Sequence, residues 1–262
     1  PPDLTLLAAD GSQINPSAHD AVPFGIINVS VFEMHPGSGN VPLQHIKTEL
    51  LMNEAVYTDY GMLGEETVAL MRDLREREML LTLASGRKPP GITLTDGPLE
   101  LFHEPKEERS YTEAFQKYQA ILEKLAVEGV IAAGFVEKSR SDLVIRLLEL
   151  PLLPDAELAT AGVQRPLKYI TDIDLYRHLL KPGQRSAIFA IQSGAKSRFQ
   201  GDLAVHFFYL NISNSDKPYL ARVELPRWAA LSMPMVNLLQ SALLWQCQQM
   251  GPRSSPYALH RA

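Results

Sequence analysis

The stretch that decides the fold reads LTLLAADGSQ at positions 4–13. Its apolar part predicts a buried strand, and Asp10 with the glycine after it predicts a turn where that strand ends. The sequence LTDGPL at 94–99 repeats the pattern, with Asp96 in the place of Asp10. We therefore expect two aspartates at the rim of a sheet, each with part of its hydration removed.

Apolar runs of strand length alternate with segments of helical period along the rest of the chain. This alternation predicts the α/β class, with a mixed sheet flanked by helices. The predicted strands cover 4–9, 24–34, 91–95, 129–136, 186–191, 203–212 and 219–225. The predicted helices cover 64–84, 112–127, a segment ending near 150, 172–180 and 226–247. The last of these is apolar nearly all round, which indicates either a core helix, the interpretation we favour, or a dimer interface.

Composition and charge restrict the class of protein. Of the 262 residues, 45% are hydrophobic and 21% charged, which excludes disorder for most of the chain and allows a sizeable core. The single cysteine, Cys247, excludes an intramolecular disulfide and a zinc site built from cysteines. The formal net charge is −5, whereas a nucleic-acid-binding chain usually has a basic region. If the chain binds nucleic acid, the positive charge must come from a local basic patch, from bound metal ions or from a partner.

The sequence also predicts where the protein is located and how many domains it has. No apolar run is long enough to span a membrane, so we expect no membrane association, and no signal peptide is visible. Together with the lone cysteine, this favours a reducing, cytoplasmic setting. We expect one domain over 1–262, trimmed at both ends, with a mobile insertion near 151–170.

Asp10 and Asp96 are candidate metal ligands. On neighbouring strands their carboxylates would repel each other unless a positive charge lay between them. A hard divalent cation such as Mn²⁺ or Mg²⁺ takes oxygen ligands and would meet this need. The other interpretation is that each Asp-Gly pair simply marks a turn.

A third carboxylate is expected on the helix predicted over 64–84. Glu78 falls on the apolar stripe of that helix, where an unpaired charge is costly. We therefore predict Glu78 as the third metal ligand, with Glu76 as the alternative. Glu78 could instead form an ion pair at the helix edge with Arg75 or Arg77.

Lys138 and His260 are candidates for proton transfer or phosphate contacts. Lys138 follows the strand predicted over 129–136, and a lysine beside a carboxylate–metal cluster can hold a scissile phosphate or orient the water. His260, close to the end of the sequence, could act as a general acid or bind the metal. Taken singly, each could equally be a solvated surface residue.

Motifs of several other chemistries are absent from the sequence. It contains no G-x-S-x-G serine elbow, no Walker A sequence and no G-x-G-x-x-G. Cys247 lies in an apolar segment, which predicts a buried and inert thiol. Metal-assisted hydrolysis by carboxylates is the chemistry that remains.

Five segments, in this order along the chain, resemble the NurA family of nucleases. They are AADGSQ at 8–13, LTDGPL at 94–99, EKSRS at 137–141, PGQRSAIF at 182–189 and YALHRA at 257–262. The resemblance implies an RNase H-like core with a carboxylate cluster that binds Mn²⁺ or Mg²⁺. It also implies cleavage of DNA, mainly single-stranded and from 5′ ends, by a homodimer docked on a HerA-type hexameric ATPase during DNA end resection for double-strand break repair.

The resemblance also assigns roles to individual residues. Asp10 and Asp96 match the two aspartates of the family, Lys138 its lysine and His260 its late histidine. The glutamate of the family maps to Glu78 or Glu76, and the apolar stripe favours Glu78.

Two other classes of function stay open. The first is a non-catalytic, RNase H-like scaffold that binds nucleic acid; converging carboxylates argue against it, because without metal they repel phosphate. The second is another carboxylate–metal phosphoesterase that acts on a small substrate. A groove lined by arginine and aromatic side chains would favour a nuclease, and an enclosed pocket would favour the small substrate.

Overall fold

The computed structural model describes residues 3–87, 90–101, 108–155, 162–163, 165–191, 199–250 and 255–262. Its strands are β1 (Thr5–Ile14), β2 (Phe24–Met34), β3 (Leu43–Met52), β4 (Tyr57–Thr58), β5 (Gly61–Met62), β6 (Gly91–Asp96), β7 (Val130–Glu137), β8 (Phe189–Ala190), β9 (Val205–Asn211) and β10 (Leu220–Pro226). Its α-helices are α1 (Glu65–Ala84), α2 (Glu108–Val127), α3 (Leu143–Glu149), α4 (Asp172–Leu179), α5 (Arg227–Ala230), α6 (Met233–Met250) and α7 (Tyr257–Arg261).

Eight strands form one sheet in the order β3-β2-β1-β6-β7-β10-β9-β8, and β4 pairs with β5 in a separate ribbon. β1, β6 and β7 run parallel to one another, whereas the other neighbouring pairs of the sheet are antiparallel. The prediction of a mixed α/β sheet flanked by helices is confirmed.

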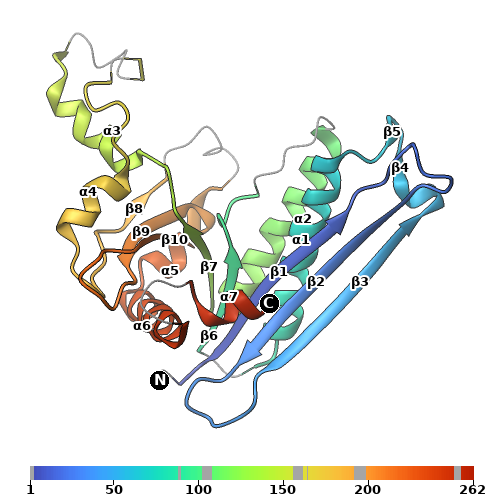
Figure 1. The fold of residues 1–262 in the computed structure, drawn as a ribbon, viewed down its shortest axis with the longest axis horizontal. Coiled ribbons are helices and arrows are strands. Elements are labelled where there is room, and N and C mark those ends of the chain that lie inside the picture. The colour runs from blue at the N-terminus through green and yellow to red at the C-terminus, as the bar shows by residue number, and fades with distance from the viewer. Residues whose placement is uncertain are drawn as a thin grey trace.

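Helices cover both faces of this sheet (Figure 1). α1 and α2 pack on one face, called here the α1 face, against residues such as Leu7 and Ala9 of β1. α5, α6 and α7 pack on the other, the α6 face, where Leu6 and Ala8 of β1 meet side chains such as Leu243. Successive side chains of β1 point to opposite faces, so this strand contributes to the hydrophobic core on each side of the sheet.

Two parts of the molecule project beyond the point where β6 ends (Figure 1). β1, β2 and β3 continue as a three-stranded arm, and α3 and α4 form a lobe on the opposite side. The ends of β6 and β7 lie between the arm and the lobe. Asp10 and Asp96, at this level of the sheet, are both exposed.

The turn predicted at Asp10 is wrong. β1 continues through Asp10 to Ile14, and Asp10 pairs with Ser30 while Gly11 pairs with Val29 of β2. The local Asp-Gly signal is overridden because β2 supplies backbone hydrogen bonds along the whole length of β1. Asp10 therefore lies within a long strand, at the level where its neighbour β6 stops.

Two edges of the sheet also differ from the prediction. β3, an edge strand, was not predicted, because most of its side chains are exposed and its sequence lacks an apolar run. At the other edge, the strand predicted over 186–191 is reduced to the two residues of β8. Edge strands carry a weak sequence signal because many of their side chains are exposed and need not be apolar.

The apolar segment after Pro226 forms two helices instead of one. α5 ends at Ala230 and α6 begins at Met233, with Pro234 in its first turn. A proline has no N–H to continue a helix, but it is accommodated in the first turn of a new one. α6 is a core helix, as favoured, and Cys247 is buried in it. Burial raises the pKa of this thiol to about 12, which agrees with the predicted inert cysteine.

The described part of the chain contains no helix with both the length and the apolar character needed to cross a bilayer. Within the segment where we expect a mobile insertion, 156–161 and 164 lie outside the described residues.

Candidate active site

Asp10 and Asp96 lie next to each other at the end of β6. β1 and β6 are parallel neighbours in which Ala9 pairs with Thr95, so an aspartate follows on each strand. Every second side chain of a strand points to the same face of the sheet. Asp10 lies two positions after Ala8 and Asp96 two positions after Leu94, and both Ala8 and Leu94 belong to the α6-face core. The two aspartates therefore also point to the α6 face. The structure thus brings together the two carboxylates that the sequence placed at strand ends.

The charge at this point of the sheet is not balanced. The pKa of Asp96 is raised above its usual value, first by partial desolvation and then by repulsion from Asp10 and Glu137. A hydrogen bond from the backbone N–H of Gly97 and the charge of His260 act in the opposite direction. A cation placed between the carboxylates would relieve this repulsion.

Glu76 of α1 faces the strand that carries Asp10. Its side chain is 8% exposed, and its Oε1 atom lies 2.7 Å from the position that a Cβ atom on Gly11 would occupy. Glu76 is also near enough to Asp10 for the two charges to repel. Gly11 therefore leaves the space that the Glu76 carboxylate fills.

The environment of Glu76 opposes its negative charge. Burial raises its pKa to about 7, although the neighbouring Arg77 and Arg72 act against this shift. Arg77 lies 3.1 Å from Oε2 of Glu76, and Arg72 lies 3.4 Å from Oε1. A carboxyl group with this pKa can gain or lose a proton near neutral pH.

The prediction that Glu78 is buried on the apolar stripe is wrong. Its side chain is 39% exposed and accepts a hydrogen bond from Arg75 at 3.0 Å, the ion pair left open by the sequence. Arg75 also binds Glu49 of β3 at 2.8 Å, which directs Glu78 toward the edge of the sheet and away from Gly11. α1 packs against β1 and β2 on one side and α2 on another, so its buried surface is wider than one stripe and includes Glu76.

Lys138 lies beyond the same end of the sheet as Asp96. β7 is the parallel neighbour of β6, Asp96 pairs with Phe135, and Lys138 directly follows the strand. Lys138 is exposed and has a φ of 53°, in the left-handed region that residues other than glycine rarely adopt. The structure therefore places this cation at the same end of the sheet as the two aspartates.

His260 reaches the site from the C-terminal end of the sequence. It lies on α7, which packs against β1, β2 and β6. Its charge acts on the pKa of Asp96, so the imidazole lies beside the carboxylate pair. Four of the five predicted site residues, Asp10, Asp96, Lys138 and His260, gather at this end of the sheet, and Glu78 does not.

Glu137 is a further carboxylate that sequence reasoning missed. It is the last residue of β7 and raises the pKa of Asp96. In the sequence, no apolar run or turn signal distinguishes it from the charged residues around Lys138. The alternation along β7 could have indicated it, because Ala133 and Phe135 belong to the α6-face core and Glu137 follows on the same side.

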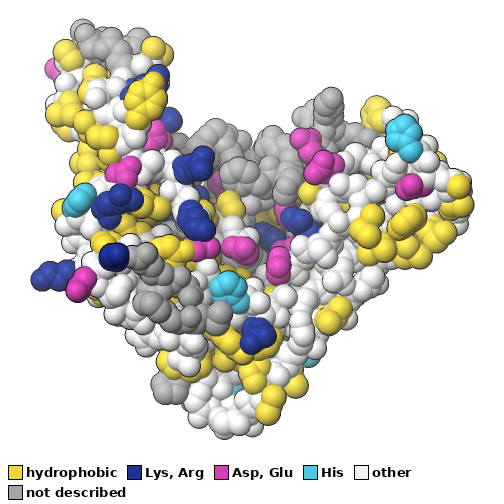
Figure 2. Space-filling view, viewed as in Figure 1, with side chains coloured by type: hydrophobic (Ala, Val, Ile, Leu, Met, Phe, Trp, Pro, Cys, Tyr) yellow, Lys and Arg dark blue, Asp and Glu magenta, His cyan; other side chains and the backbone are white. Residues whose placement is uncertain are grey.

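The surface around these residues is concave. Figure 2 shows a hollow between the lobe of α3 and α4 and the three-stranded arm, with acidic and basic side chains gathered across its floor. Lys138 and Arg140, in the loop after β7, are both exposed. The hollow is open, in contrast to the enclosed pocket expected for a small substrate.

A model of the NurA domain matches residues 4–262. The chain belongs to the NurA family. Among solved structures, this NurA chain is similar to the NurA nuclease from Sulfolobus solfataricus, with a TM-score of 0.60 and 13% identity over 98% of this chain and 77% of that one. It is also similar to endonuclease V from Ciona intestinalis in complex with DNA (TM-score 0.41, 10% identity, 98% of this chain and 82% of that one). No protein of curated function matches it in sequence.

The NurA chain has an RNase H-like fold, as the resemblance implied. The antiparallel strands β1, β2 and β3 are followed by β6 and β7, which run parallel to β1. This order places Asp10 and Asp96 on adjacent central strands.

The donor groups of the site suit a hard divalent cation, although they do not enclose one. Among the described residues, no group of three His, Cys, Asp or Glu side chains is close enough together to hold a metal ion as it stands. Asp10 and Asp96 nevertheless offer carboxylate oxygens that repel each other. Mg²⁺ is commonly bound through one or two carboxylates, waters and substrate phosphates instead of a complete protein cage. Asp10 and Asp96 therefore fit the metal that the family resemblance implies.

Proposed function

We propose that this NurA-family chain is a DNA nuclease that hydrolyses phosphodiester bonds with Mn²⁺ or Mg²⁺. The observation that carries the proposal is the pair Asp10 and Asp96, exposed and adjacent on parallel strands, at the end of β6 that lies between the lobe and the arm (Figure 1). The structural likeness to a protein described as a nuclease supports the same reaction class. Asp10 and Asp96 would hold the metal, and Glu76 replaces Glu78 as the third carboxylate.

Each residue has a distinct task in the proposed hydrolysis. When bound, the metal would activate water and neutralise charge on the scissile phosphate. Lys138, exposed at the end of β7, stabilises the charge that develops on the phosphate oxygens. His260, beside Asp96, protonates the leaving oxygen as its bond to phosphorus breaks. Glu76, with a pKa of about 7, can release a proton when a cation approaches.

The substrate we propose is mainly single-stranded DNA, cut as a 5′–3′ exonuclease and as an endonuclease. The open hollow between lobe and arm supports an extended substrate over a small one. A binding scaffold without catalysis is disfavoured, since Asp10, Asp96 and Glu137 would repel phosphate in the absence of metal. The loop after β7, at the same end of the sheet as Asp96, carries the exposed cations Lys138 and Arg140.

We further propose that the enzyme acts in the cytoplasm, as a homodimer with a HerA-type hexameric ATPase, in end resection for double-strand break repair. The net charge of −5 supports a partner that delivers DNA to the site. The arm presents apolar side chains on the same face as Asp10, which supports a contact with another chain there. They are Ile14 at 51% exposed, Ile46 at 62% and Leu50 at 57%.

The proposal is tested by replacing the adjacent aspartates. Asp10→Ala and Asp96→Ala should each lower the rate of Mn²⁺-dependent digestion of single-stranded DNA by about 100-fold or more, while the circular dichroism spectrum stays that of the wild type. Asp20→Ala, in the exposed connection between β1 and β2, is the control and should leave the rate unchanged. Unaltered digestion by folded Asp10→Ala and Asp96→Ala variants would refute the assignment.

A further inference from the structure

We propose that the buried ion pair between Arg222 and Glu224 positions the two loops that carry Asp96 and Lys138. Both residues lie on β10 and point to the α1 face, on the opposite side of the sheet from the aspartates. The inference rests on the proposed nuclease function, because it assigns the pair a role toward that reaction. Neither residue reaches the hollow, so each acts through the loops it holds.

Glu224 holds the loop that follows Asp96. Its side chain is 1% exposed, and its Oε2 atom accepts a hydrogen bond from the backbone N–H of Leu99 at 2.9 Å. The carbonyl oxygen of Leu99 accepts a hydrogen bond from the hydroxyl of Tyr118 on α2 at 2.5 Å. Both backbone polar groups of Leu99 are therefore bound by buried side chains.

The loop is held tightly enough to require a glycine beneath it. A Cβ atom on Gly134 of β7 would lie 2.6 Å from the nitrogen of Leu99 and 2.8 Å from the carbonyl oxygen of Gly97. Gly134 is also the residue that pairs with Glu224 across the sheet. The loop after Asp96 thus crosses β7 directly over the residue beside Glu224.

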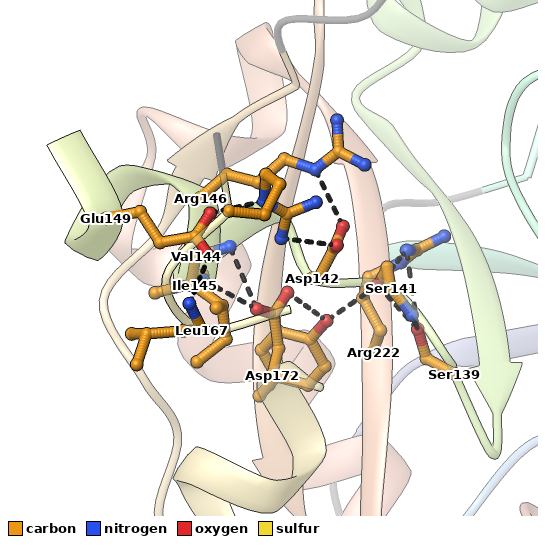
Figure 3. Close-up of polar contacts among 12 residues, drawn as sticks. Ser139, Ser141, Asp142, Val144, Ile145, Arg146, Glu149, Leu167, Asp172 and Arg222 are labelled. Atoms are coloured by element: carbon orange, nitrogen blue, oxygen red, sulfur yellow. Dashed lines mark hydrogen bonds and ion pairs between the residues drawn. The ribbon is translucent and has the colours of Figure 1, made fainter. Parts of the chain in front are cut away.

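Arg222 holds the loop that follows Lys138. Its Nη2 atom lies 2.6 Å from Oε1 of Glu224, and its Nη1 atom donates to the hydroxyl of Ser141 at 2.7 Å and approaches that of Ser139 at 3.4 Å. Figure 3 shows Arg222 directed at these two serines. Ser139 follows Lys138, whose left-handed backbone needs fixed neighbours to persist.

The same contacts extend to the third carboxylate. Arg77 lies 5.6 Å from the centre of the Tyr118 ring and 3.1 Å from Oε2 of Glu76. Burial raises the pKa of Tyr118 to about 12, so this hydroxyl stays protonated and continues to donate to Leu99. One connected set of buried contacts therefore joins Glu76, the loop after Asp96 and the loop after Lys138.

A role in stability alone does not account for this pair. A buried ion pair is weak evidence for stability, because the loss of hydration offsets much of the attraction. Arg222 and Glu224 instead bind backbone and hydroxyl groups of two separate loops. The partners of catalytic or ligating side chains commonly act this way, by fixing orientation.

The test separates positioning from stability by comparing two variants of the pair. Glu224→Gln leaves Arg222 buried and unpaired, whereas Arg222→Met with Glu224→Leu removes both charges and so avoids that penalty. We expect both to lower kcat on single-stranded DNA about 10- to 100-fold, with KM within about threefold, because neither residue lines the hollow. Hydrogen exchange at the amides of Leu99 and of 139–141 should become faster in both.

Glu33→Gln is the matched control. Glu33 is also 1% exposed and bound by an arginine, Arg87, at 2.9 Å. It lies at the opposite end of β2 from the hollow, paired with Leu43 and Leu7. It should lower the melting temperature while leaving kcat and exchange at both loops unchanged.

Three results would overturn the proposal: a double variant whose kcat stays within about twofold of the wild type, unchanged exchange at both loops, or an equal loss of kcat in Glu33→Gln. If the wild type itself does not cut DNA with Mn²⁺, it is the proposed nuclease function that fails. Hydrogen exchange then still decides whether Arg222 and Glu224 hold the two loops.

Discussion

The Oε1 atom of Glu76 occupies the space in front of Gly11, 2.7 Å from where a Cβ atom of that residue would stand. This close approach connects α1 to the strand that carries Asp10. It explains why a glycine follows Asp10 although the chain makes no turn there. A glycine is needed at position 11 because any larger side chain would occupy the space of the Glu76 carboxylate.

Gly11→Ala should therefore displace Glu76 and lower nuclease activity. The added Cβ would also lie 2.8 Å from Cγ of Arg72, so the strand and helix would have to separate or both side chains would have to move. We expect a loss of stability of about 1–3 kcal/mol and a fall in kcat of about tenfold or more. Urea denaturation and digestion of single-stranded DNA would measure the two effects.

Gly64→Ala is the control for that substitution, because a Cβ on Gly64 meets no atom within 4 Å. It should retain the activity of the wild type. Equal activity of Gly11→Ala and Gly64→Ala would show that the position of Glu76 does not matter.

Glu76→Gln and Glu78→Gln should differ in their effect on activity, although the two residues are only two positions apart on α1. Glu76→Gln removes the carboxylate that faces Gly11, and we expect a loss of activity of about 100-fold. Glu78→Gln breaks an exposed ion pair with Arg75, which contributes about 0.2–1 kcal/mol, and should leave activity unchanged. The reverse order of activities would restore Glu78 as the third carboxylate.

Divalent cations should stabilise the wild type through Asp10 and Asp96. At a concentration about 100 times the dissociation constant, Mn²⁺ would add about 2.7 kcal/mol and raise the melting temperature by about 5–10 °C. The double variant Asp10→Asn with Asp96→Asn should melt at a higher temperature than the wild type without metal, because the repulsion is removed. Mn²⁺ should also leave the melting temperature of this double variant unchanged. A rise as large as that of the wild type would show that the ion binds elsewhere.

The stability contributed by Glu33 should depend on pH. Burial alone would raise the pKa of Glu33, but hydrogen bonds from His45 and His35 and the charge of Arg87 outweigh it and hold the pKa below its usual value. A carboxylate whose pKa is lower in the folded state stabilises the protein above its unfolded-state pKa, and this contribution is lost as the pH falls through the folded-state pKa.

Glu33→Gln should accordingly lower the free energy of unfolding at neutral pH by about 1.5–3 kcal/mol. The difference from the wild type should shrink once the pH falls below about 4. Denaturation of both proteins over this pH range provides the measurement. A difference that stays constant with pH would show that the charge of Glu33 is not what stabilises the fold.

Much of the central sheet could be predicted because its signals are local. The apolar run of β2 was placed at its observed bounds, and the helix predicted over 64–84 matches α1 to within one residue. β3 escaped prediction because an exposed edge strand does not need an apolar run. The turn assigned to Asp10 failed because pairing with β2 extends β1 past a local turn signal.

The local sequence is enough to predict that Asp10 and Asp96 lie where the core ends, because each follows an apolar run. Tertiary packing placed Glu76 against Gly11 and left Glu78 away from it, because α1 is buried against both the sheet and α2. It also decided that His260 lies beside Asp96 and that Arg222 and Glu224 lie beneath two loops. The spacing of apolar residues predicts which side chains are buried. It does not predict which distant element packs against them, because that depends on contacts between segments far apart in the sequence.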